Sequence, residues 1–359
     1  MMANPGMDSR HDTGGGDVKD RLLAFVGVMA VLWAMVIAIP VAQKGAAPRT
    51  REGRPDLQGV WSYATLTPLE RPAEFAGQPF LTDKQAAEFE RRTLDVQNRD
   101  RRDGEGPAGR GSDGRTDLDR AYNQVWWEYG SKIVGTRRTS LIVDPADGRI
   151  PPLTPDGQRR AEDKRGLWTA NGEYEGGARG LSFDSHVDRP LQERCLGWTV
   201  TGPPMVPGAY NNNMELFQTP ETVVIVNEMV HDQRIIPVDG RPQIGSGFRL
   251  WMGSSRGRWD GDTLVVDTTN FTHRTAFQGS SSALHVVERF TRVSADRILY
   301  QFTVDDPNTW TRPWSAEIPM IATRGPLFEY ACHEGNYGLP NILRGARFTE
   351  KEAARDPRR

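Results

Sequence analysis

Two kinds of hydrophobic pattern divide this chain. Residues 22–42 form an almost unbroken apolar run with no charged side chain, close to the length of about 20 residues that crosses a bilayer. Toward the C-terminus, apolar and polar positions alternate along 284–290 and 298–304, as the two-residue period of a strand requires. We expect strands at 222–230, 234–238, 263–269, 284–293, 297–304, 315–321 and 327–331. Because a long sheet must hide its edges, the series predicts a mainly β fold, a large antiparallel meander that forms a barrel or a curved sheet.

A few peripheral helices are expected beside this sheet. Thr82 and Gln85 form a capping-box pattern ahead of an apolar stripe, which predicts a helix over 83–97. Apolar residues recur at helical spacing over 125–133 and predict a second stripe packed on the body. A helix also begins near the Thr-Pro pair at 154. We further expect a strand over 139–143, a tight turn at 147–148 and a second strand over 149–153.

The apolar run at 22–42 predicts that the body is exported, since the only long polar part of the chain follows it. A retained membrane helix and a cleaved signal peptide remain alternatives, because Pro40 lies just before the first acceptable cut, after Ala42. Both place the body in the periplasm or elsewhere outside the cytoplasm, held in the inner membrane if the segment is uncleaved. If the segment is uncleaved, the membrane is a partner through it.

Composition shifts along the chain predict its domain organisation. Glycine and alternating charges in 98–116 are typical of a mobile surface loop. The expected parts are a cytoplasmic or leader region 1–21, a signal peptide or anchor 22–43, a linker 44–55, a single β-rich domain 56–349 that contains the loop, and a polar tail 350–359.

Charge and cysteine content narrow the class of partner. The formal net charge is −2 with 26% charged residues, which lacks the basic excess of a nucleic-acid-binding protein. Nucleic acid is therefore not expected as a partner. The chain has two cysteines, Cys195 and Cys332, outside any CxxC pattern. In an oxidising compartment such a pair favours a disulfide.

Four segments resemble an abundant family of exported bacterial proteins: Asp56 to Trp61, Pro207 to Asn213, Gly257 to Leu264 and Tyr330 to Glu334. The resemblance covers nearly the whole body. It implies export and a shared fold, and it brings no established activity or catalytic residue. The Gly59-x-Trp61 opening before a meander is also similar to lipocalin-like barrels, as an analogy of geometry.

Histidines beside carboxylates are the first candidate chemistry, because a carboxylate fixes the tautomer of an imidazole and raises its basicity. No complete catalytic signature and no dinucleotide or phosphate-binding motif is present. The candidate catalytic residues are His231, Asp232, His285, His333 and Glu334. The strand order we expect places the three histidines at one rim, where they would share a site for acid/base work or metal ligation. A surface or hydrogen-bonded structural role is the alternative for each, and neither a metal nor a cofactor is specified.

Two further groups are candidate ligand-binding residues. Carboxylates followed by tryptophans suit flat, partly apolar ligands such as sugar rings, and a run of asparagines offers amides to a polar ligand. These residues are Asp305, Asp306, Trp310, Arg312 and Trp314, and Tyr210, Asn211 and Asn212. An ordinary turn between strands explains the first group equally, and a loop with left-handed backbone explains the second.

Three functions remain open at this stage. The first is a periplasmic enzyme of hydrolase or lyase type that binds a small organic or carbohydrate substrate on the concave side of the sheet. The second is a non-catalytic binding protein for an apolar ligand, which an apolar interior without a buried ionisable cluster would favour. The third is an envelope structural or interaction protein, which a pocket-free sheet would favour.

Overall fold

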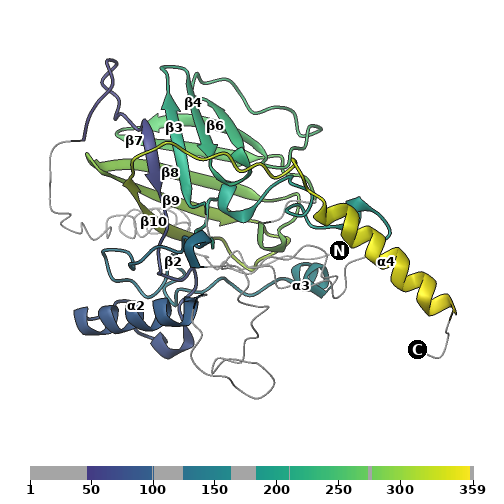
Figure 1. Cartoon of the computed structure of the whole chain (residues 1–359). Helices are drawn as coiled ribbons and strands as arrows, with labels where there is room; N and C mark the ends of the chain where they lie inside the picture. Colours follow the sequence, from purple (N-terminus) through teal and green to yellow (C-terminus); the bar gives the residue numbers. More distant parts are fainter. Residues whose placement is uncertain are drawn as a thin grey trace, which may run out of the picture. The chain divides into compact units, whose positions relative to one another are not determined.

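The computed structural model describes residues 47–98, 100, 124–162, 183–209, 211–273 and 277–355 (Figure 1). The apolar segment 22–42, nearly all of the expected loop 98–116 and Tyr210 lie outside these residues. Within them, no helix combines the length and the apolarity that a membrane crossing requires.

An antiparallel sheet organises the described part of the chain. Its strands follow the order β5-β4-β3-β1-β10-β9-β8-β7-β6, and a short further strand, β2, pairs with β10. They are β1 (Gly59–Ser62), β2 (Ile142–Asp144), β3 (Asn213–Gln218), β4 (Thr222–Asn227), β5 (Gln233–Pro237), β6 (Ser254–Asp260), β7 (Thr263–Thr269), β8 (His285–Ser294), β9 (Arg297–Asp305) and β10 (Trp314–Ala322).

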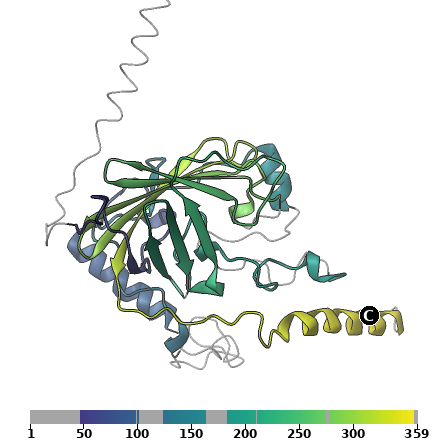
Figure 2. The ribbon, with the colours of Figure 1, turned by 90° about the horizontal axis from the view of Figure 1, so that it is seen from above.

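The sheet curves until its two outer strands approach each other, so that it is nearly closed into a barrel (Figure 2). Arg234 on β5 donates to the hydroxyl of Ser255 on β6 at 3.3 Å. A Cβ on Gly257 of β6 would lie 2.5 Å from a methyl carbon of Val238, so glycine permits this close approach. The predicted mainly β fold, a meander forming a barrel, is confirmed.

Large apolar side chains fill the inside of the barrel. Along β9, and along β8 as far as Phe290, every second residue is buried, which is the alternation that predicted these strands. The largest buried side chains include Trp61, Tyr63, Phe290, Tyr300 and Trp314, each at most 1% exposed. Burial of one such side chain stabilises the fold by roughly 2–3 kcal/mol. The interior is therefore a packed core.

Three helices accompany the sheet in the described part of the chain: α2 (Asp83–Gln97), α3 (Pro155–Glu162) and α4 (Gly338–Arg355). α2 has the predicted bounds, because Thr82 and Gln85 form the capping box that satisfies its first N–H groups. Short 3-10 helices occur at Ala73–Phe75, Gln124–Trp126, His186–Asp188, Thr199–Thr201, Met229–His231 and Phe277–Gly279.

Three local predictions are wrong. Residues 327–331 form no strand, because β10 already ends at Ala322, next to β1. The stripe at 125–133 forms only a 3-10 turn, with Val125 79% exposed, and the residues after it have no regular secondary structure, although Tyr129 and Ile133 do pack in a small apolar cluster. Residues 149–153 do not pair with the preceding strand, because β2 pairs with β10 instead.

The predicted disulfide joins Cys195 to Cys332, with Cα atoms 5.7 Å apart and a sequence separation of 137. It connects the segment before β3 to the chain that follows β10. Tyr330 and Cys332 pack against the cluster of Val200, Met229 and Val230. The C-terminal segment is thereby fixed beside the loops at one end of the barrel.

Candidate functional site

The antiparallel pairing assigns each strand terminus to one end of the barrel. β8 begins at His285, and pairing around the sheet places the start of β5, the start of β6 and the end of β7 at the same end. We call this the His285 end. The loops there hold the two hollows described next.

The first hollow is a narrow apolar slot of about 30 Å³. Three loops of the His285 end contribute to it: the segment around Cys195, the residues before β6 and the residues after β7. It is lined by Leu191, Leu196, Gly197, Trp198, Thr201, Gly202, Pro203, Trp251, Met252, Phe271 and Phe277. As it stands, the slot has room for about one water molecule.

Buried hydrogen bonds hold one wall of this slot in place. The phenol of Tyr63 donates to the Val200 carbonyl at 2.8 Å, and the Asn227 amide donates to the Thr201 carbonyl at 3.0 Å. Gly202 has φ of +70°, and a Cβ there would lie 2.7 Å from the Met205 nitrogen. Glycine is thus needed at this turn, and the wall is rigid where β1 and β4 support it.

The second hollow is open, with a volume of about 440 Å³, and is lined by Arg249, Trp251, Thr272, His273 and Ser282. Nη1 of Arg249 donates to the carbonyls of Phe271 at 3.3 Å and of Ser282 at 2.6 Å. Among the described residues, its Nε and Nη2 have no hydrogen-bond partner. Those two donors remain for a ligand.

Trp251 lines both hollows, and the guanidinium carbon of Arg194 lies 6.0 Å from the centre of its ring. An aromatic, apolar slot therefore adjoins a polar hollow that contains an arginine. We call this pair of hollows the Trp251 site. Its chemistry suits a small ligand with a flat apolar part and an anionic group, because Arg binds carboxylates through paired N–H donors.

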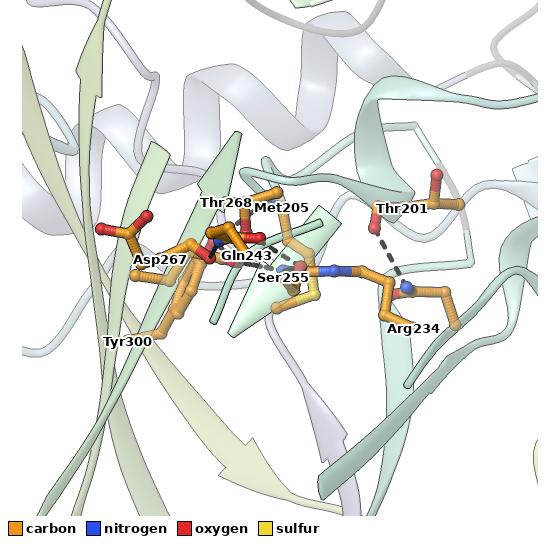
Figure 3. A network of polar contacts seen from close by, with 10 residues as sticks. Thr201, Met205, Arg234, Gln243, Ser255, Asp267, Thr268 and Tyr300 are labelled. Atoms are coloured by element: carbon orange, nitrogen blue, oxygen red, sulfur yellow. Dashed lines mark hydrogen bonds and ion pairs between the residues drawn. The ribbon is translucent and has the colours of Figure 1, made fainter. Parts of the chain in front are cut away.

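A polar network lies inside the barrel itself (Figure 3). Arg234, 3% exposed in its side chain, pairs with the fully buried Glu288 through two hydrogen bonds. The phenol of Tyr300 donates to Glu288 at 2.8 Å and accepts from the Met205 N–H at 3.0 Å. Burial, with the Glu288 charge, raises the pKa of Tyr300 well above its usual value, so the phenol stays protonated and donates. The network is buried away from solvent, so its role is to hold the strands of the core together.

His285 and Asp267 form a hydrogen-bonded pair on the outer face of the barrel. Their Nε2 and Oδ2 atoms are 3.0 Å apart, and the two side chains are 40% and 35% exposed. The hydrogen bond raises the pKa of His285 and lowers that of Asp267. Glu288, three residues along β8, faces inward, as the two-residue period requires. The imidazole therefore has the carboxylate neighbour that acid/base work needs.

The other candidate catalytic side chains are exposed, except that of Asp232, which is partly buried. His231 is exposed in the 3-10 turn between β4 and β5, at the His285 end. Next to it, burial raises the pKa of Asp232 to about 6. His333 and Glu334 are exposed beside the disulfide. No group of three or more His, Cys, Asp or Glu side chains in the described chain is placed to hold a metal, and the shared histidine site stays a prediction.

The candidate residues after β9 are held in a turn and in the core. Asp306 is 1% exposed and accepts from the Ser281 hydroxyl at 2.9 Å and the Thr309 hydroxyl at 2.8 Å. Trp310 and Trp314 are at most 2% exposed. Asp305 ends β9 opposite His285, and exposed Arg312 pairs with Asp144 at 2.7 Å. These positions give the two tryptophans no contact with solvent.

The asparagine run has a structural role at one position. Asn212 is fully buried, accepts from the Gly208 N–H at 2.7 Å and donates to the Glu128 carbonyl at 2.8 Å. Asn211 has φ of +55°, the left-handed backbone that asparagine tolerates. Tyr210 lies outside the described residues.

The Trp251 site was missed at the level of sequence. Arg249, Trp251 and Met252 lie in a loop without periodicity, and the residues they face are distant in the chain. The run Arg-Leu-Trp-Met at 249–252 could have indicated it, since a loop rich in large apolar side chains tends to bury them against other parts of the fold.

No family model, no curated protein and no solved structure matches this chain. The fold defines it as a nearly closed, mainly antiparallel β-barrel with a packed interior, peripheral helices and one disulfide within the described residues.

Proposed function

We propose that this protein is a non-catalytic binding protein for a small anion with an aromatic or other flat apolar part. The main support for this proposal is the Trp251 site, in which an apolar slot and a hollow that contains an arginine share one tryptophan. The interior does not meet the expectation of an apolar, ligand-holding cavity, because it is filled and contains the buried ion pair of Arg234 and Glu288. It leaves no room for a ligand on the concave side of the sheet. The ligand therefore binds among the loops of the His285 end.

The proposal includes a location outside the cytoplasm. Two features support it: the disulfide between Cys195 and Cys332, which persists in oxidising compartments, and the apolar segment 22–42. The disulfide also fixes one wall of the slot. The shape of the site therefore depends on a bond that an oxidising compartment maintains.

A ring enters the slot only after a side chain moves, because the slot holds about one water molecule. Met252 is suited to move, since its unbranched, flexible side chain fills irregular gaps and adapts. The ring then stacks against Trp198, Trp251 or Phe271. The anionic group meets Arg249, which its two backbone acceptors hold in position.

Binding of phenylacetate, followed by calorimetry or tryptophan fluorescence, tests this function. We expect saturable binding of phenylacetate and weaker binding of the neutral 2-phenylethanol. Arg249→Gln should weaken phenylacetate binding by about tenfold or more, because a hydrogen bond to a charged group contributes about 1.5–3 kcal/mol, and it should leave 2-phenylethanol unchanged.

The matched control is Arg289→Gln, at a partly exposed arginine on β8 that pairs with Asp260 and lines neither hollow. It should leave both affinities unchanged. Equal losses in the two arginine variants, or no saturable binding of either compound by the wild-type protein, would overturn the proposal.

A hydrolase- or lyase-type enzyme is the second candidate, and the hydrogen bond between His285 and Asp267 favours it. Hydrolysis of p-nitrophenyl acetate tests this reading. Saturable turnover that is lost in His285→Asn and retained in His273→Asn would support it, whereas equal rates in all three proteins would rule out a role for this pair in ester cleavage.

A further inference from the structure

α4 presents a line of exposed side chains that the barrel and its loops do not cover. Tyr337, just before the helix, Arg344, Phe348, Lys351 and Arg355 are all exposed, the two aromatics by 76% and 66%. Their spacing returns to the same side of a helix with 3.6 residues per turn. We call these five residues the α4 stripe.

The stripe is also the basic side of the helix. Glu350 pairs with Arg347 and Glu352 pairs with Arg355, so both acids of α4 are already neutralised. In the described chain, Arg344 and Lys351 have no ion-pair partner. The stripe thus exposes two aromatic side chains and three cationic ones, and two of the three cations have no counter-charge in the described chain.

The opposite side of α4 differs in character. Its apolar residues, Leu339, Ile342, Leu343 and Ala346, are half-buried. A helix that only needed solubility would place polar residues on its exposed side. Large aromatics there are instead typical of a surface that meets a partner.

We propose that the α4 stripe docks on an anionic lipid surface. Aromatic rings settle at the headgroup level of a bilayer, and lysine and arginine beside them attract anionic headgroups. A second copy of this chain is disfavoured as the partner, because a two-fold contact would oppose identical cations. The apolar segment 22–42, if retained, would hold the chain close to such a surface. This inference does not depend on the proposed ligand.

A fluorophore attached to the stripe tests the docking on the full chain. Both native cysteines are joined in the disulfide, so Phe348→Cys supplies a selective thiol for an environment-sensitive label. The labelled chain is reconstituted into vesicles of phosphatidylcholine alone or with about one third phosphatidylglycerol. The chain contains the apolar segment 22–42 in both vesicle preparations, so the contribution of this segment to membrane binding is the same in both. We expect a blue-shifted, several-fold brighter emission in the anionic vesicles only, removed by salt near 1 M.

Two controls make the result specific to the stripe. Thr349→Cys is exposed on the same helix but off the stripe, and its label should respond weakly. Adding Arg344→Gln and Lys351→Gln to the Phe348→Cys chain should return its emission to the level in neutral vesicles. Equal emission from position 348 in the two vesicles, an equal response at 349, or a response that survives the charge removal would overturn the proposal.

Discussion

At the scale of single residues, the most consequential pair is Arg234 and Glu288. Their charges are removed from water, and two hydrogen bonds between them, with that from Tyr300, compensate. The desolvation of both ions is costly, so such a pair contributes little net stability while its partners are both present. Nε of Arg234 has no partner in the described chain, which adds to the cost. The pair fixes how β5 meets β8 across the interior.

Removal of one partner should therefore be worse than removal of both. We expect Glu288→Leu or Arg234→Met alone to lower the free energy of unfolding by about 3–5 kcal/mol, because each leaves a buried charge unpaired. The double variant should lose less than either single variant, as measured by urea denaturation. Additive losses would show that the two charges do not depend on each other.

Asp232 makes a second residue-scale prediction, on pH. Burial raises its pKa from 3.8 to about 6, so the folded state binds the proton more tightly than the unfolded state. The protonated carboxyl therefore contributes fully to the free energy of unfolding below about pH 4, and this contribution is lost as the pH rises through 6. Asp232→Asn should thus be more stable than wild type at pH 8 by roughly 3 kcal/mol, and equal to it near pH 4. Thermal unfolding at both pH values measures this, and a constant difference would contradict it.

At the scale of elements, regular patterns were predicted well and irregular ones were not. α2 and β7 have their predicted bounds, because a capping box marks the start of α2 and the turn dipeptide Asp260-Gly261 precedes β7. β6 was missed since its inward positions include Ser255 and Gly257, which carry no apolar alternation. α4 gave no prediction either, although its apolar positions recur at helical spacing.

The candidate site shows the same limit. His285 was singled out from its place at the start of a strand, and its partner Asp267, on the neighbouring strand, depends on a pairing that one sequence does not reveal. Trp310 and Trp314 looked available for a ligand because sequence alone cannot distinguish a buried tryptophan from an exposed one. The Trp251 site combines residues of three loops, at 191–203, 249–252 and 271–282, which only tertiary structure brings together.

The disulfide gives a prediction at this scale. Cys195→Ala with Cys332→Ala should lower the free energy of unfolding by roughly 4–5 kcal/mol, because the bond closes a loop of more than a hundred residues in the unfolded chain. Since Cys195 lies in the segment that forms the slot, phenylacetate binding should weaken as well. Urea denaturation and calorimetry test the two effects, and a variant with unchanged stability and affinity would contradict both.

At the scale of the whole molecule, the barrel acts as a scaffold and the loops at one end form the proposed binding site. Its interior is filled with aromatic side chains and a sealed ion pair, so the sheet contributes rigidity. The segment around Cys195, the residues before β6 and the residues after β7 then form the Trp251 site. Loops positioned by a rigid scaffold are where binding residues concentrate.

The central claim is that the Trp251 site binds a small aromatic anion, and a crystal structure with 4-bromophenylacetate tests it most directly. We expect an anomalous bromine peak in the slot between Trp251 and Phe271, with Met252 displaced and the carboxylate within hydrogen-bond reach of Arg249. A bromine peak elsewhere, or an empty Trp251 site at a ligand concentration that saturates binding in solution, would contradict it.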